Sequence, residues 1–229
     1  MKEQKLYHKV ISFIFLAVFG IFMLTPEISE AAENYTVGIV GIESRVKNIN
    51  LGEYMNLDEI DKSPLSYAQE LFHEVVLYGD LKKIGLKGVE NTAYANMARK
   101  SEEEFQKIQA QMRQAMNLLD NGDTSEAVKL FDKQSDYLIY GYINNITVSH
   151  REAFGTSNTI LSVNLSVRIV DAETGKIVCV ATGEGSTSNH GDSYKKTLNI
   201  GNDKVELESW IQSLQKAMDQ VVEKIIKQA

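Results

Sequence analysis

The sequence predicts an α/β fold in which a mixed sheet of about five strands carries packed helices and a long amphipathic C-terminal helix. Three observations predict it. Segment 136–185 contains strand-like runs joined by a tight turn, run 35–42 is short and mostly apolar, and run 203–227 has one continuous apolar face. Because both periodicities occur in one chain, purely helical and purely β folds are disfavoured.

The run 160–170 gives the clearest strand signal. Leucine, valine and isoleucine occupy the odd positions of 161–169, whereas serine, asparagine and arginine occupy the even positions of 162–168. This period of two predicts a sheet with one face in the core and one face in water. The turn from Asp171 to Gly175 places glycine where a bulged hairpin loop needs a positive φ.

The remaining strands are predicted from shorter runs. Residues 35–42 carry no charge and suit a central strand that is covered on both faces. Residues 82–89 contain two glycines and suit a weak edge strand. Residues 137–148 are predicted to form the strand before the 160–170 run. A further strand is predicted after the turn at 171–175.

Four helices are predicted from caps and spacing. Ser63 and Pro64 begin the first, which Gly79 ends. Capping boxes at 101–104 and 123–126 begin a longer and a shorter helix. The fourth runs over 203–227, and its apolar face predicts a core helix. Residues 43–62 show no period and are predicted to form a loop.

The N-terminal residues have the pattern of a secretory signal peptide. Lysines precede an apolar-rich run over 10–24, and small residues follow near Ala31 and Ala32. The run is shorter than the roughly 20 residues of a spanning helix, so an anchor is the less favoured alternative. We therefore expect a signal peptide over 1–31 and a single domain over 32–229.

The amino-acid composition limits the cell compartment and the binding partners that we expect for the protein. The only cysteine is Cys179, so the chain can form neither an internal disulfide nor a lipid anchor at the cleavage point. We expect Cys179 to be a buried, inert thiol. The formal net charge of -7 disfavours nucleic acid and anionic membranes as partners. No stable membrane anchor is expected after cleavage.

The sequence contains no motif of a catalytic, cofactor-binding or metal-binding site, and we predict no residue in any of these roles. His73, His150 and His190 are isolated in sequence, and we read His73 as flanking the apolar stripe and the other two as solvated loop residues. Gly183-Glu-Gly185 lacks the third glycine of a dinucleotide motif. The acids at 102–104 suit a helix N-terminus. We predict a protein that is not an enzyme and needs no cofactor.

The segment from Asp136 to the C-terminus resembles a known family. DYLIYGYI, followed by VNLSVRIVDAETGKIVCVATGEG, is similar to the pattern of the curli-assembly transport component (CsgG) family. The family includes flagellar outer-membrane assembly factors and activators of penicillin-binding proteins. The resemblance implies a periplasmic α/β module and an envelope protein as partner.

The connections predict a relative without the pore hairpins of curli-type members. Each spanning strand needs about 9 to 11 residues with alternate apolar side chains. The connection Ser149–Thr159 is too short, and Gly183–Asn202 has few apolar residues. We expect both to be exposed loops that form a partner site or act only as connectors.

We therefore expect a noncatalytic accessory protein of outer-membrane or cell-surface assembly, located in the periplasm or peripheral to the outer membrane. It would act by protein–protein interaction. A periplasmic protein that binds a small molecule or glycan, or an unrecognised hydrolase, is the alternative. Self-association into a homo-oligomer is a further alternative.

Overall fold

The computed structural model describes residues 35–47, 49–51, 63–89, 102–130, 135–153, 156–190 and 196–229. The signal-peptide prediction over 1–31 and the domain start at residue 32 lie outside these residues. So do most of the predicted loop over 43–62 and the capping serine of the 101–104 box.

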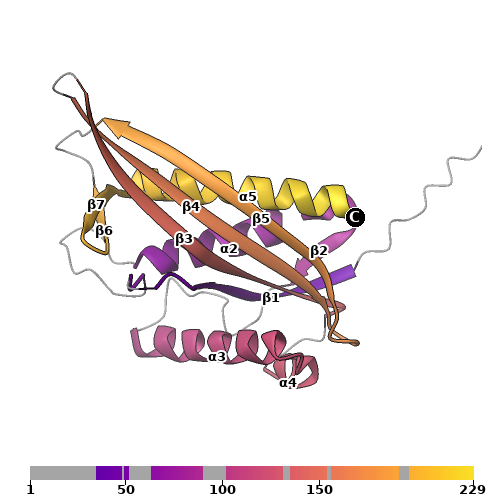
Figure 1. The fold of residues 1–229 in the computed structure, drawn as a ribbon. Coiled ribbons are helices and arrows are strands. Elements are labelled where there is room, and N and C mark those ends of the chain that lie inside the picture. The colour runs from indigo at the N-terminus through magenta and orange to yellow at the C-terminus, as the bar shows by residue number, and fades with distance from the viewer. Residues whose placement is uncertain are drawn as a thin grey trace, which may run out of the picture. The chain divides into compact units, whose positions relative to one another are not determined.

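The described residues contain one larger sheet, one small hairpin and helices on both sides (Figure 1). In chain order the elements are β1 (Tyr35–Ser44), α2 (Pro64–Tyr78), the 3-10 helix η1 (Asp80–Ile84), β2 (Leu86–Val89), α3 (Glu102–Asp120), α4 (Thr124–Val128), β3 (Tyr137–Ala153), β4 (Thr156–Asp171), β5 (Ile177–His190), β6 (Thr197–Ile200), β7 (Asp203–Glu206) and α5 (Leu207–Gln228).

The larger sheet has the strand order β2-β1-β3-β4-β5. β1 pairs in parallel with β2 and β3, whereas β3, β4 and β5 pair in antiparallel fashion. β6 and β7 form a separate antiparallel hairpin. The predicted mixed sheet of the α/β class, with its long C-terminal helix, is confirmed.

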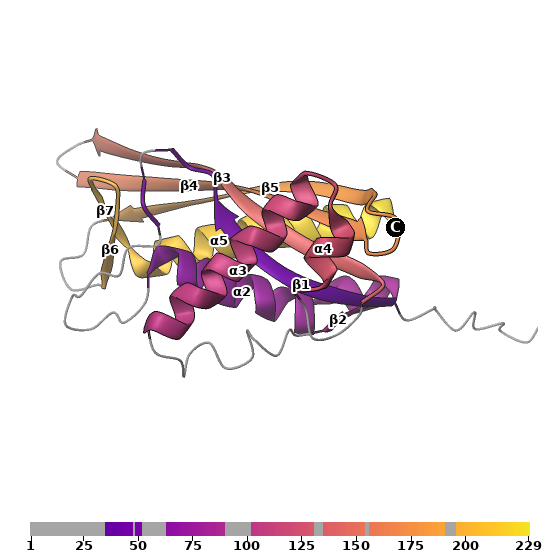
Figure 2. The ribbon, with the colours of Figure 1, turned by 90° about the horizontal axis from the view of Figure 1, so that it is seen from below.

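The helices form two layers, one on each face of the sheet. α2 and α5 cover the inner face, while α3 and α4 lie on the outer face against β1 and the adjacent part of β3 (Figure 2). The inner core contains Phe72 from α2 and Trp210 from α5, both fully buried. The Trp210 indole N–H donates to the Pro64 carbonyl at 3.0 Å, which ties α5 to the start of α2.

Several local predictions are confirmed. Ile39 and Val40 are both 0% exposed and belong to opposite cores, so β1 is covered on both faces. Ser63 caps α2, because its hydroxyl accepts from the Ser66 amide at 3.2 Å. Gly175 has φ +72°, as the predicted hairpin turn requires.

Both connections predicted to be loops are largely strand, and that part of the prediction is wrong. β3 runs to Ala153 and β4 begins at Thr156, so every described residue of the loop predicted over Ser149–Thr159 lies in a strand. β5 runs on to His190 through the tract predicted to be loop. Polar side chains misled the prediction, because an exposed strand face is as polar as a loop.

Gly183 and Gly185 let α5 approach β5 closely. A Cβ atom on Gly183 would lie 1.9 Å from the Ala217 carbonyl oxygen, and one on Gly185 would lie 1.9 Å from the Ser213 carbonyl oxygen. The two glycines therefore serve helix–strand packing, which explains their spacing of two residues.

Three smaller predictions are corrected. α5 begins at Leu207 and not at residue 203, because 203–206 pair as strand β7 with β6. The edge strand predicted over 82–89 begins only at Leu86, because residues 82–84 belong to η1. Asp123 precedes α4 but its side chain makes no capping hydrogen bond, so the second capping box is not formed.

Candidate binding site: the open sheet face and the charged pocket beside α3

The outer face of β3, β4 and β5 carries small polar side chains where α3 and α4 do not reach it. Ser162, Asn164 and Ser166 of β4 are half-buried, whereas Thr182 and Glu184 of β5 are exposed. The strand register places Asn164 opposite Glu184 and Ser166 opposite Thr182, so these side chains form one surface. This surface is called the open sheet face below.

Hydrogen bonds between neighbouring strands hold the open sheet face in place. Ser162 Oγ donates to Ser186 Oγ at 3.0 Å, and Asn144 Nδ2 donates to Asn164 Oδ1 at 3.2 Å. Ser166 Oγ donates to Asn144 Oδ1 at 3.3 Å. Side chains fixed in this way lose little conformational freedom when a partner binds, so the surface is preorganised.

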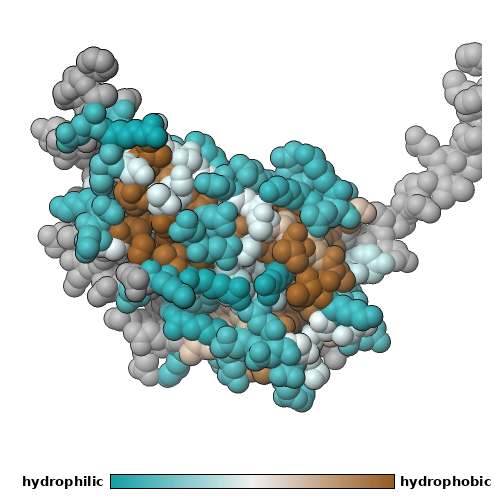
Figure 3. All heavy atoms as spheres, in the orientation of Figure 1, coloured by the Kyte–Doolittle hydropathy of each residue, from teal (hydrophilic) through white to brown (hydrophobic). Residues whose placement is uncertain are grey.

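An apolar patch borders the open sheet face at the start of β5. Ile177, Val178 and Val180 are 49%, 53% and 47% exposed. Figure 3 shows brown atoms on this side of the molecule below the position of the C-terminus, next to paler and teal atoms over the strands. An apolar centre with a polar surround is the usual composition of a protein–protein interface.

Asp120 joins α3 to the sheet at the other border of the open sheet face. Its carboxylate accepts from Tyr140 Oη at 3.0 Å, from Tyr142 Oη at 2.9 Å and from an Arg168 guanidinium nitrogen at 2.7 Å. Arg45 completes the set with an ion pair. Two arginines thus compensate a carboxylate at a helix C-terminus, where the helix dipole disfavours negative charge.

The tyrosines of this cluster are poor acids. Burial raises the pKa of Tyr140, and burial together with the hydrogen bond to Asp120 raises the pKa of Tyr142. The Arg45 guanidinium carbon lies 3.4 Å from the centre of the Tyr142 ring, a cation–π contact. Both phenols therefore stay protonated and act as hydrogen-bond donors.

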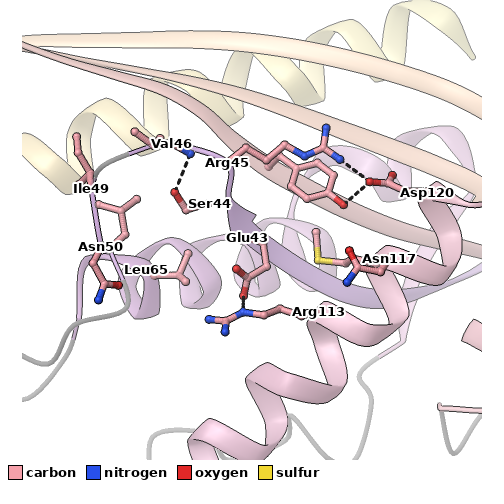
Figure 4. A pocket seen from close by; sticks show the side chains of 13 residues that line it. Glu43, Ser44, Arg45, Val46, Ile49, Asn50, Leu65, Arg113, Asn117 and Asp120 are labelled. Atoms are coloured by element: carbon pink, nitrogen blue, oxygen red, sulfur yellow. Dashed lines mark hydrogen bonds and ion pairs between the residues drawn. The ribbon is translucent and has the colours of Figure 1, made fainter.

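A pocket of about 420 Å³ lies at the carboxyl end of β1, next to Asp120 (Figure 4). Glu43, Arg45, Arg113 and Asn117 supply polar walls. Glu43 Oε1 accepts from Arg113 Nε at 3.1 Å, and burial raises the pKa of Glu43 despite this arginine. The carboxyl ends of parallel strands are a common place for ligands in α/β proteins.

No motif in the sequence marks these pocket residues. Glu43 and Arg45 follow the apolar run 35–42 directly, which could have signalled a site at the end of a parallel strand. Arg113 and Asp120 come from α3 and gave no such signal, because charged residues on a helix are usually solvated. Glu43 and Arg45 come close to the two α3 residues only because α3 packs on the sheet.

The histidines and the cysteine lie in different environments. His73 lies on α2 beside Phe72 and is buried, and burial lowers its pKa to about 4. Strand β3 carries His150 and strand β5 carries His190, although both were predicted to lie in loops. Cys179 is half-buried, burial raises its pKa, and its thiol donates to Gln228 Oε1.

His150 connects a hydroxyl to a carboxylate in the order of a catalytic triad. Its Nδ1 lies 3.1 Å from Thr159 Oγ1, and its Nε2 lies 3.1 Å from Asp203 Oδ1. The His150 and Asp203 side chains are 50% and 42% exposed. A triad acts with oxyanion donors in a site that excludes water. Because the His150 and Asp203 side chains are exposed to solvent, we interpret this hydrogen-bonded series as a structural link between β3 and β7.

Among the described residues, no group of three or more histidine, cysteine, aspartate or glutamate side chains is placed to hold a metal ion. Within the same ranges, every helix is too short or too polar to cross a lipid bilayer.

Comparisons with known proteins give fold likenesses only. No protein-family model matches the chain, and no curated protein matches it. Among solved structures, the chain is similar to the hypothetical protein CT253 from Chlamydia trachomatis, with 10% identity, a TM-score of 0.46, and 85% of this chain and 94% of that chain covered.

Two further solved structures are similar at lower scores. Lipoprotein GNA1162 from Neisseria meningitidis has 10% identity and a TM-score of 0.37, with 69% of this chain and 88% of that one covered. A PelC dodecamer from Paraburkholderia phytofirmans has 7% identity and a TM-score of 0.32, with 85% and 88% covered. Likenesses at these identities and scores carry no information about function.

Proposed function

We propose that the protein is an exported, noncatalytic accessory module of the bacterial cell envelope that acts by binding another protein. The signal-peptide pattern over 1–31 supports export. The resemblance of the segment from Asp136 onward to the CsgG family supports a role in outer-membrane or cell-surface assembly. The binding role is supported most directly by the open sheet face.

The open sheet face supports protein binding for three physical reasons. It lies on three paired strands, so its backbone is rigid. Its hydroxyl and amide groups are already oriented by hydrogen bonds between Ser162 and Ser186 and between Asn144 and Asn164. The exposed Val178 and Val180 beside it supply the apolar area that anchors most protein interfaces.

The test is capture from solubilised envelope with the purified protein as bait. The face variant combines Ser162→Arg with Val180→Arg. The control variant combines Tyr78→Arg with Gln212→Arg, which adds the same charge at exposed positions on α2 and α5. We expect a protein that is enriched by wild type and by the control and is reduced at least about tenfold with the face variant, which corresponds to about 1.4 kcal/mol. Equal enrichment by all three baits would contradict the proposal.

A second candidate function is the binding of a small polar molecule, because the pocket beside α3 is lined by charged groups. The Glu43–Arg113 and Arg45–Asp120 pairs leave the pocket without net charge from these four residues. A neutral or zwitterionic ligand, such as a sugar or a glycan end, would suit such a lining.

Thermal-shift measurements with glycan and nucleotide panels separate the two candidate functions. A ligand of this pocket would raise the melting temperature of wild type and of the face variant alike. It would have no effect on an Arg113→Ala variant. A ligand that stabilised the Arg113→Ala variant equally would exclude this pocket as the binding site.

A further inference from the structure

β5 is the last strand of the larger sheet. The edge of β5 that points away from β4 lies next to side chains of α5. The described residues place β4 on one side of β5 and no strand on the other. An edge strand presents unpaired backbone N–H and C=O groups to which another strand can add. With 14 residues, β5 is long enough for such pairing.

Side chains of α5 occupy this edge in a regular series. Lys216 Nζ donates to the Ser186 carbonyl at 2.9 Å, and Lys224 Nζ donates to the Thr182 carbonyl at 2.6 Å. Between them, Gln220 Nε2 donates to the Glu184 carbonyl at 2.8 Å. The Gln220 Oε1 atom also accepts from the Glu184 amide at 3.1 Å.

Gln228 continues the series one turn further along α5. Its Nε2 donates to the Val180 carbonyl at 3.4 Å, the longest bond of the set. The four residues of α5 are spaced by four, and the four carbonyls of β5 are spaced by two. Four helical residues rise about 6 Å, and two strand residues rise about 6.6 to 6.8 Å, so the two series stay in register.

The close packing of α5 on β5 makes this register possible. Gly183 and Gly185 let the helix backbone touch the strand, since any larger side chain would collide with the carbonyls of Ala217 or Ser213. Lys216, Gln220, Lys224 and Gln228 are all exposed, so they contribute little to the apolar core. Their shared feature is the contact with the backbone edge of β5.

We infer that this row of four side chains, called the α5 row below, blocks the β5 edge against pairing with β5 of a second copy. Two copies of the same strand, related by a two-fold axis, present matching outward donors and acceptors to each other. The α5 row occupies four outward carbonyls and the outward amide of Glu184. Its two lysines also place like charges where the edges would meet, which disfavours edge-to-edge pairing.

The test removes the α5 row and measures the mass of the purified protein. The row variant replaces Lys216, Gln220, Lys224 and Gln228 with alanine. The control variant replaces Gln212, Asp219, Glu223 and Lys227, which are exposed residues of α5 without a bond to β5, with alanine. Light scattering and sedimentation velocity are recorded over a range of concentrations, and circular dichroism checks that each variant is folded.

We expect the row variant to form species of roughly twice the wild-type mass or more as concentration rises, while the control keeps the wild-type mass. The row variant loses two positive charges from a chain of formal net charge -7, so general repulsion between copies increases. Self-association would therefore occur against this repulsion. A row variant that keeps the wild-type mass at every concentration would overturn the inference.

A proline substitution shows whether new association uses the β5 edge. The Glu184 amide points outward, toward Gln220, so Glu184→Pro removes an edge donor without removing a bond to β4. Added to the row variant, it should restore the wild-type mass. Association that survives Glu184→Pro would locate the contact elsewhere and would contradict the inference. If the row variant is unfolded, the milder pair Gln220→Ala with Lys224→Ala gives the same comparison.

Discussion

Asp120 is the residue that couples the outer helix layer to the sheet. It receives hydrogen bonds or ion pairs from four side chains that come from the end of β1, from β3 and from β4. No sequence motif marks it, because its four partners are distant along the chain. Its role follows only from the packed structure.

Replacing Asp120 with alanine should lower the free energy of unfolding by about 2 to 3 kcal/mol, since two tyrosine hydroxyls and two arginines lose an acceptor in a half-buried site. Urea denaturation measures the change. Asp219→Ala on the exposed side of α5 serves as the control and should cost no more than about 0.5 kcal/mol. A loss for Asp120→Ala as small as that of the control would contradict the assigned role.

His73 should make stability depend on pH. Burial lowers its pKa to about 4 in the folded state, from an ordinary value of 6.5. Between these values the unfolded state binds more protons, so stability is fully present above pH 6.5 and falls as the pH decreases toward 4. Between pH 7 and pH 5 this residue alone should cost about 2 kcal/mol.

The difference between wild type and His73→Gln isolates this contribution, because other titrating groups are common to both proteins. Denaturant unfolding at pH 7, 6 and 5 should show that the variant loses less stability than wild type over this interval. If stability changed with pH in parallel for the two proteins, the prediction would be contradicted, because folding would then leave the pKa of His73 unchanged.

At the level of elements, α5 packs closely on β5 because Gly183 and Gly185 carry no side chain. The sequence predicted α5 as a core helix from its apolar face, which is confirmed by the burial of Trp210, Leu214 and Met218. It did not predict the path of β5, because Gly183, Gly185 and the polar residues around them are as typical of a loop as of a strand beneath a helix.

Gly185→Val should prevent stable folding or cost more than about 4 kcal/mol, because the added side chain collides with the Ser213 carbonyl. Gly122→Ala is the matched glycine control. A Cβ atom there meets no atom within 4 Å, so only the positive φ of 82° is strained, at a cost of about 1 kcal/mol. Thermal melts compare the two variants, and equal losses would refute the close-approach role of Gly185.

At the level of the whole molecule, the alternation of apolar and polar residues predicted the sheet well. The odd positions of 161–169 are buried and the even positions of 162–168 are half-buried, as the period of two predicted. The pocket beside α3 could not be predicted in this way. It depends on where a helix from another part of the chain rests on the sheet, and neither Arg113 nor Asp120 differs in sequence context from a solvated surface residue.

The central claim is that the open sheet face binds another protein of the cell envelope, and site-specific photo-crosslinking in living cells tests it most directly. A photoreactive amino acid is placed at Ser162, at Thr182 or, as the control, at Lys227 on the exposed side of α5. We predict one discrete adduct with an envelope protein from Ser162 and Thr182 and none from Lys227. Adducts from Lys227 alone, or from no position, would contradict the claim.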